Sequence, residues 1–159
     1  MKLPTCYEDR ADPRVPDFLA TEAYAIAAET RTVDEAAALG SILHHEGGNC
    51  IRVQTRYTHS GGYSVFQLEG KRHLYKQPFL GLDYPAIHNA VYAAVDVWRH
   101  TWNCGPTFSD RMTSYAGKPC GIHWATLDAR ASTFWYLRNV MVKEMKIMHS
   151  ENIIERLDK

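Results

Sequence analysis

Apolar side chains recur three and four positions apart along much of the chain, which is the spacing of one helix face. The first such stretch predicts a helix over residues 17–29, beginning at Asp17 and ending at Glu29. Its expected buried face consists of Phe18, Leu19, Ala23, Ile26 and Ala27. Residues 1–16 carry three prolines and many charges, so we expect an irregular N-terminal arm there.

The second helix is predicted over residues 32–46, and both of its ends carry signals. Thr32 is a suitable N-cap, and Glu35 stands three residues later, where a capping box needs it. Gly47 and Gly48 follow at the position where a helix stops. The buried stripe should hold Val33, Ala36, Leu39, Ile42 and Leu43.

Residues 49–69 change character, because Ile51, Val53 and Thr55 alternate and a β-prone run follows the turn at residues 61–62. We expect a hairpin or a small irregular β lobe in this region. Further helices are predicted over residues 85–102, 107–116 and 122–148, with a weakly helical tail at 153–157. The predicted fold class is therefore α+β and mostly helical, with one domain over residues 17–159.

Composition narrows the function classes. The chain has 159 residues with 18 basic and 18 acidic side chains, so its net charge is zero. This balance argues against a nucleic-acid binder that relies on bulk charge. No apolar run is long enough to cross a membrane, and the first ten residues turn polar too early for a secretory signal peptide. We therefore expect neither nucleic acid nor membrane insertion.

The four cysteines leave two interpretations open, namely four free thiols or at least one disulfide. If a bridge exists, Cys104–Cys120 is the first choice, since both lie in one Pro/Gly-rich stretch. A zinc site is a weaker alternative, in which Cys104 and Cys120 would join His100 and His123. The favoured interpretation needs no metal or other cofactor.

Glu46 is the most informative single residue. It ends the second predicted helix three residues after Leu43 and four after Ile42, so it extends the apolar face. Burial would raise the pKa of this carboxyl group, and the helix C-terminus would act in the same direction. A carboxyl group that keeps its proton beside a cleft is suited to general acid catalysis. The alternative is that Glu46 turns outward or pairs with an arginine such as Arg52 or Arg130.

Aromatic residues offer a weaker indication. Helical spacing places Trp98 and Trp135 in the core. Tyr57, Tyr63 and Tyr75 fall in the loop-rich region and are better candidates for a groove that binds sugars.

Three blocks resemble the lysozyme-like superfamily, in particular soluble lytic transglycosylases and phage lysins. The first is AAALGSILHHE, residues 36–46, followed by two glycines. The second is GYSVFQ, residues 62–67, which ends twenty-one residues after Glu46, and the third is SYAGK, residues 114–118, followed by a helix over 130–137. The chain departs from the family pattern at Gly47, Ser64-Val65 and Ala116.

The resemblance implies a role for each matched residue. Glu46 would be the general acid and then the general base. Gln67 and Tyr115 would contact the sugar or position the acid, and Tyr63 and Ser64 would lie with them in the substrate site. A hydrolase would also need a second carboxylate, for which Glu69 is the best candidate. Without one, the substrate completes the reaction and a 1,6-anhydro sugar forms.

The resemblance also implies a substrate and a place of action. The expected activity is cleavage of the β-1,4 bond between N-acetylmuramic acid and N-acetylglucosamine in peptidoglycan. The protein would act in the periplasm or cell wall, released by a holin, carried in a virion or otherwise delivered with partner proteins. Two alternatives stay open: an inactive lysozyme-like module that binds glycan or serves as a virion part, and a small zinc-stabilised helical interaction domain.

Overall fold

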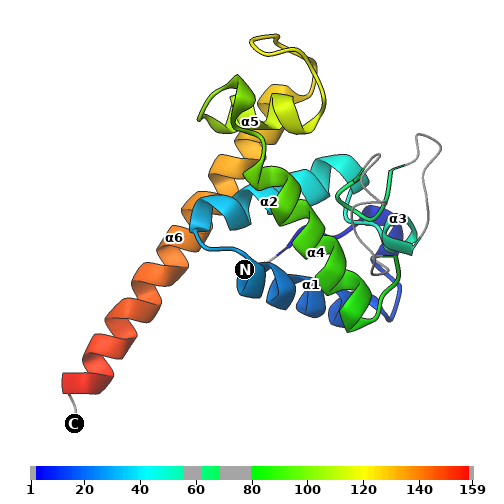
Figure 1. Cartoon of the computed structure of the whole chain (residues 1–159). Coiled ribbons are helices and arrows are strands. Elements are labelled where there is room, and N and C mark those ends of the chain that lie inside the picture. Colours follow the sequence, from blue (N-terminus) through cyan, green and yellow to red (C-terminus); the bar gives the residue numbers. More distant parts are fainter. Residues whose placement is uncertain (1–2, 56–61, 69–79, 158–159) are drawn as a thin grey trace.

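A computed structural model describes residues 3–55, 62–68 and 80–157, with side chains as far as Glu151. Six α-helices and two 3-10 turns follow one another in the described chain (Figure 1). They are η1 (Tyr7–Asp9), α1 (Val15–Glu29), α2 (Val33–Gly47), α3 (Ile51–Thr55), α4 (Tyr84–Arg99), η3 (Trp102–Cys104), α5 (Phe108–Tyr115) and α6 (Leu127–Leu157).

The expected α+β class is wrong for the described residues, which contain helices and turns but no strand. Residues 51–55 form helix α3 although their apolar residues alternate. The reason lies outside the segment: the Asp9 carboxylate accepts a hydrogen bond from the Ile51 backbone N–H at 2.6 Å and so caps the first turn. The Gln54 amide then donates to the Gly81 carbonyl and accepts from the Val65 N–H.

The β-prone run forms a tight turn instead of a strand. The Leu68 N–H donates to the Tyr63 carbonyl at 3.0 Å, which closes the run on itself. Ser64 and Gln67 both have positive φ angles, 61° and 51°, and this backbone conformation is incompatible with a strand. We name residues 63–68 the pocket turn. Part of the predicted lobe, residues 56–61 and 69, lies outside the described residues, as do Tyr57 and Tyr75.

The helices predicted from local signals are confirmed. Helix α2 begins after Thr32, whose hydroxyl accepts from the Glu35 N–H at 3.1 Å, and the Glu35 carboxylate accepts from the Arg31 N–H. It ends at Gly47, with Gly48 at a φ of 62°. Helix α1 starts two residues earlier than predicted because Pro16 fits a first helical turn.

The later helices differ from the predictions mainly at their ends. Helix α4 stops at Arg99, three residues before the predicted end, and η3 follows it. Asp83 caps its start by accepting from the Ala86 N–H at 2.9 Å. Helix α6 starts at Leu127, five residues later than predicted, and continues without a break to Leu157.

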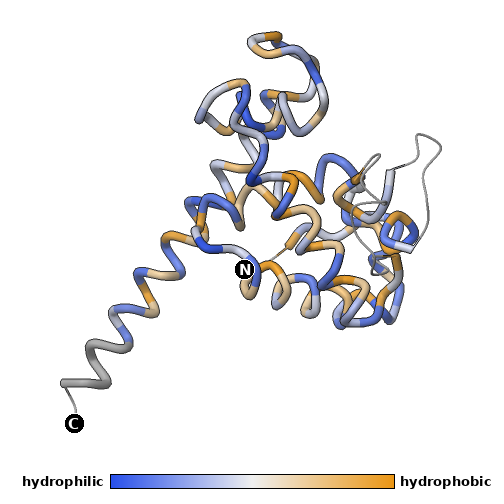
Figure 2. Tube along the Cα trace, viewed as in Figure 1, coloured by the Kyte–Doolittle hydropathy of each residue, from blue (hydrophilic) through white to orange (hydrophobic). Residues whose placement is uncertain are grey.

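Helices α1, α2 and α4 pack together, while α6 crosses α2 and then extends away from the body (Figure 1). Its buried stripe of Phe134, Leu137 and Met141 contacts the core. Beyond that point Met145 and Met148 are exposed, and hydrophobic and hydrophilic residues alternate along this part of α6 (Figure 2). Within the described residues, no helix combines the length and apolar character needed to cross a membrane.

The tryptophan predictions have opposite outcomes. Trp98 is 2 % exposed and belongs to the core, as predicted. Trp135 is 53 % exposed, so its predicted core position is wrong. Trp135 directly follows Phe134, and the next position on a helix turns about 100° away from the buried stripe.

All four cysteines form disulfides, so the interpretation with four free thiols is wrong. Cys104–Cys120 is the pair chosen from the sequence, and it closes a loop of sequence separation 16. Cys6–Cys50 was not predicted, and it ties the N-terminal arm to the start of α3. Leu3 of the same arm is buried in the core.

Candidate functional site

The crossing of α2 and α6 brings two distant parts of the chain together. Gly40 lies at the contact, where a Cβ atom would be 2.6 Å from Leu137 Cδ1. The Ser41 hydroxyl donates to the Arg130 carbonyl at 2.8 Å, and His45 Nε2 lies 2.8 Å from Thr133 Oγ1. These contacts fix the C-terminal end of α2 beside the first turn of α6.

Glu46 lies at that end of α2 and forms an ion pair. Its Oε1 accepts a hydrogen bond from Arg130 Nη1 at 2.7 Å, and the two side chains are 22 % and 9 % exposed. Of the two interpretations of Glu46, the structure shows the one in which the residue pairs with Arg130. Arg130 is held in turn by Thr126, whose hydroxyl accepts from Nε at 3.1 Å. Its guanidinium also lies over the Trp124 ring, 5.1 Å from the centroid.

The pocket turn packs directly on the residue that follows Glu46. A Cβ atom at Gly47 would lie 2.8 Å from both the Cα and the carbonyl oxygen of Val65. Any larger residue would push the turn away, so this contact requires glycine at position 47. The turn thus places Gln67, whose amide donates to the Ser64 carbonyl at 2.8 Å, close to the end of α2.

Tyr115, the last residue of α5, also holds this turn. Its hydroxyl donates to the Phe66 carbonyl at 2.7 Å. The hydrogen bond joins two of the predicted blocks, which are 49 residues apart in the sequence. Tyr115 therefore fixes the backbone next to Gln67. Its side chain also lines the pocket described next.

A pocket of about 410 Å³ opens between these elements. Three of the predicted site residues line it: Glu46, Gln67 and Tyr115. The other lining residues are Leu68, Val97, Ala116, Lys118, Trp124, Ala125, Thr126 and Arg130.

The remaining predicted site residues do not line this pocket. Ser64 is fully buried, and its hydroxyl accepts from the Phe66 N–H at 3.2 Å. Tyr63 is half-buried and packs against the core. Glu69 lies outside the described residues. Sequence reasoning also missed Lys118 and Trp124 as pocket residues, although Lys118 ends the third block of the resemblance.

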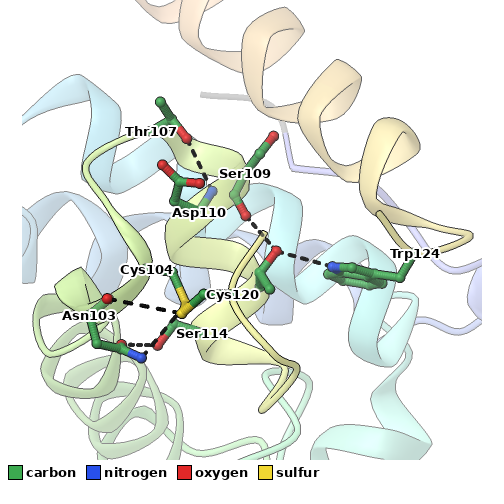
Figure 3. Close-up of a disulfide and its surroundings, with 9 residues drawn as sticks. Asn103, Cys104, Thr107, Ser109, Asp110, Ser114, Cys120 and Trp124 are labelled. Atoms are coloured by element: carbon green, nitrogen blue, oxygen red, sulfur yellow. Dashed lines mark hydrogen bonds between the residues drawn. A yellow bond between two sulfur atoms is a disulfide. The ribbon is translucent and has the colours of Figure 1, made fainter. Parts of the chain in front are cut away.

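The Cys104–Cys120 disulfide holds the outer wall of the pocket (Figure 3). The wall is the loop between α5 and α6, which we name the wall loop, residues 116–126. Trp124 is fixed to α5 because its Nε1–H donates to the Thr113 hydroxyl at 3.1 Å (Figure 3). Lys118 begins the same loop, and its backbone N–H donates to the Thr113 carbonyl at 3.0 Å.

The proposed zinc ligands are engaged elsewhere. Cys104 and Cys120 are bonded to each other, so neither is a thiolate. His100 contacts the Asp96 carbonyl at 2.7 Å, and His123 contacts the Asp128 carboxylate at 3.1 Å. A second cluster, Cys6, Asp9 and Cys50, also contains a disulfide instead of free thiols. The described residues thus offer no thiolate zinc site.

The pocket carries more positive than negative charge. Glu46 is its one acidic lining residue among those described, against Arg130 and Lys118. Lys118 Nζ lies 5.3 Å from the centroid of the Trp124 ring, the same ring that Arg130 covers. No protein-family model matches the chain, and comparison with the curated proteins and with the solved structures finds no match.

Proposed function

We propose that this protein cleaves the glycan strands of peptidoglycan, with Glu46 as the general acid and then the general base. The observation that supports it is the arrangement of Glu46, Gln67 and Tyr115. They come from three blocks that resemble lysozyme-like proteins and lie far apart in the sequence, yet they line one pocket. The resemblance predicts that these three residues share one site.

The chemistry starts at the bond between C1 of one sugar and the glycosidic oxygen. Glu46 donates its proton to that oxygen as the C1–O bond breaks, and the leaving strand departs with a free hydroxyl. The sugar left behind carries positive charge at C1, and the Glu46 carboxylate then removes the proton from its C6 hydroxyl. That oxygen attacks C1, so a 1,6-anhydro sugar forms and Glu46 regains its proton.

This one-acid route suits the described lining of the pocket. Glu46 is the acidic residue there, whereas a double displacement or a water attack needs a second carboxylate about 5–9.5 Å away. Glu69, the candidate for that second role, is outside the described residues. We therefore propose the anhydro product first and the hydrolytic product as its alternative.

The other pocket residues have roles that follow from their contacts. The half-buried Trp124 ring offers a flat apolar surface on which the face of a sugar packs. Tyr115 acts as a positioning residue, because its hydroxyl holds the Phe66 carbonyl and with it the backbone beside Gln67. Gln67 brings an amide to the pocket, where it can hydrogen-bond to a sugar hydroxyl.

The ion pair supports a second candidate, a module that binds glycan without cleaving it. The Arg130 guanidinium holds the Glu46 carboxyl group at 2.7 Å, so the group that would donate the proton is already engaged. Turnover therefore requires the Glu46–Arg130 pair to open when glycan binds. A protein in which the pair stays closed would be a binding module.

Digestion of purified peptidoglycan tests both candidates, with the products identified by mass spectrometry. The wild type should release anhydro-muramyl products, and Glu46→Gln should lower the rate by about 10²–10⁴-fold while it keeps glycan binding. Glu151→Gln is the matched control, because Glu151 is exposed on the distant part of α6. Hydrated reducing ends would favour the hydrolase. Binding without product, from several wall types, would establish the binding module.

A further inference from the structure

Two cations at the pocket have unused hydrogen-bonding capacity. The Arg130 side chain is 9 % exposed, and its hydrogen bonds to Glu46 and Thr126 use two of its five N–H groups. Lys118 forms no ion pair with any residue that the structure describes, and its ammonium group lies over the Trp124 ring. Arg130 lines the pocket, so its remaining N–H groups are available to a ligand there.

Both cations are held in place by the protein. Arg130 is fixed by Thr126 and by the crossing of α2 and α6. Lys118 is fixed at its backbone by the hydrogen bond to the Thr113 carbonyl, in a loop that the Cys104–Cys120 disulfide closes. The centroid of the Trp124 ring lies 5.3 Å from Lys118 Nζ and 5.1 Å from Arg130 Cζ, and all three residues line the same pocket.

We propose that Lys118 and Arg130 form a carboxylate-binding subsite beside Glu46. Its ligand is a glycan that carries a carboxylate on or next to the sugar at the scissile bond, held by the Lys118 ammonium and the free N–H groups of Arg130. This inference rests on the proposed function and narrows its substrate to peptidoglycan strands that carry a free carboxylate at the scissile sugar.

The subsite also explains how the Glu46–Arg130 pair opens. An arriving carboxylate competes with Glu46 for the Arg130 guanidinium, which binds carboxylates in preference to neutral groups. Once Arg130 turns to the substrate, Glu46 is released from the hydrogen bond at 2.7 Å. An acidic substrate would thus free its own general acid, and a neutral glycan would leave the pair closed.

Binding measurements with matched glycans test the subsite. The probes are peptide-free glycan strands with the sugar carboxylate exposed, the same strands with that carboxylate amidated, strands that retain their peptides, and a neutral N-acetylglucosamine hexamer. Affinity is measured by titration calorimetry at two salt concentrations. We expect the carboxylate-bearing strands to bind about tenfold more tightly than the amidated strands and the hexamer. The peptide-bearing strands show whether the sugar or the peptide supplies the carboxylate.

Lys118→Met is the decisive variant, since Lys118 is exposed and its loss should leave folding intact. It should weaken binding of acidic strands about tenfold and of the hexamer less than twofold, and Lys118→Arg should restore the preference. Lys146→Met removes the same charge from an exposed position on the distant part of α6 and should change neither affinity.

Two results would overturn these proposals, and they are distinguishable. Equal affinity for acidic and amidated strands, with cleavage still observed, would remove the subsite and leave the proposed function standing. Failure to bind or cleave any of the four glycans would remove the proposed function and the subsite with it.

Discussion

Two carboxyl groups of this protein, Glu22 and Glu46, differ in their burial and in whether a cation lies beside them. Glu22 of α1 is 1 % exposed, and its Oε1 has no hydrogen-bond partner among the described residues. Glu46 of α2 is 22 % exposed and pairs with Arg130 at a pocket. Burial raises the pKa of Glu22 to about 8, although a hydrogen bond from Asn49 opposes the rise.

The sequence predicts that Glu46 is both buried enough to keep its proton and placed at the cleft. The comparison shows that these two properties belong to different residues. The acid that keeps its proton through burial is Glu22, which does not line the pocket. The acid at the pocket has a cation beside it instead. A cavity and a partner that a substrate can displace therefore mark the candidate site better than depth of burial does.

The largest expected effect is on the pH dependence of stability, through Glu22→Gln. Between about pH 4.5 and pH 8 the folded state holds a proton on Glu22 that the unfolded chain releases, so wild-type stability should fall as the pH rises. The maximal slope is about 1.4 kcal/mol per pH unit. Glu22→Gln should abolish this decline, which makes the variant more stable than the wild type at pH 8 by several kcal/mol, on the order of 4 at most.

Urea unfolding from pH 4 to pH 9 measures this effect, with Glu151→Gln as the exposed control. Parallel curves for the wild type and Glu22→Gln would show that Glu22 does not titrate between these limits.

The next effect should come from Arg130→Met, which leaves Glu46 half-enclosed without its cation. We expect a loss of about 2 kcal/mol in unfolding free energy at pH 7, below the value for a fully buried pair because Glu46 is 22 % exposed. Chemical denaturation at pH 7 measures this loss. An unchanged free energy of unfolding would mean that neither the ion pair nor the packing of Arg130 on Trp124 contributes to stability.

A smaller effect of opposite sign to Glu22→Gln is expected for Glu46→Gln. The variant exchanges a charged hydrogen bond to Arg130 for a neutral one, so stability at pH 8 should fall by about 1 kcal/mol. Thermal unfolding of the two glutamine variants side by side provides the measurement. Stabilisation by both substitutions would remove the distinction between the two carboxyl groups.

The smallest effect is expected for Asn49→Gly, which tests the neighbour of Glu22. Asn49 has a φ of 54°, a conformation that glycine adopts readily, so the backbone should be kept. Loss of the Asn49 side chain removes its hydrogen bond to the Pro4 carbonyl and costs less than about 1 kcal/mol. It also removes the contact that lowers the pKa of Glu22, so the decline of stability should continue above pH 8.

Elements with local signals could be predicted from the sequence, and those with distant partners could not. Thr32, Glu35 and Gly48 define α2 within one stretch of chain. Helix α3 depends on Asp9, 42 residues before the N–H group that it caps. No local pattern contains that contact, so the alternating residues there suggested a strand.

The candidate site could likewise be predicted only in part. The three blocks identified Glu46, Gln67 and Tyr115 as candidate site residues, and these residues line one pocket. The ion pair between Glu46 and Arg130 depends on the crossing of α2 and α6, where Gly40 lies. From the sequence, this pair was only one of several open alternatives for Glu46. Glu22 could have been found, because it stands four residues after Phe18 and four before Ile26 on the buried face of α1.

The length of α6 has a practical consequence for studying the pocket. Its 31 residues make a rod of roughly 46 Å at 1.5 Å per residue. Arg130 lies in the first turn, so the far end of the rod is about 40 Å from the pocket along the helix axis. A dye or a surface linker attached at that end would stay far from a glycan bound in the pocket. The helix could therefore serve as a spacer when the protein is immobilised, and the pocket would remain accessible.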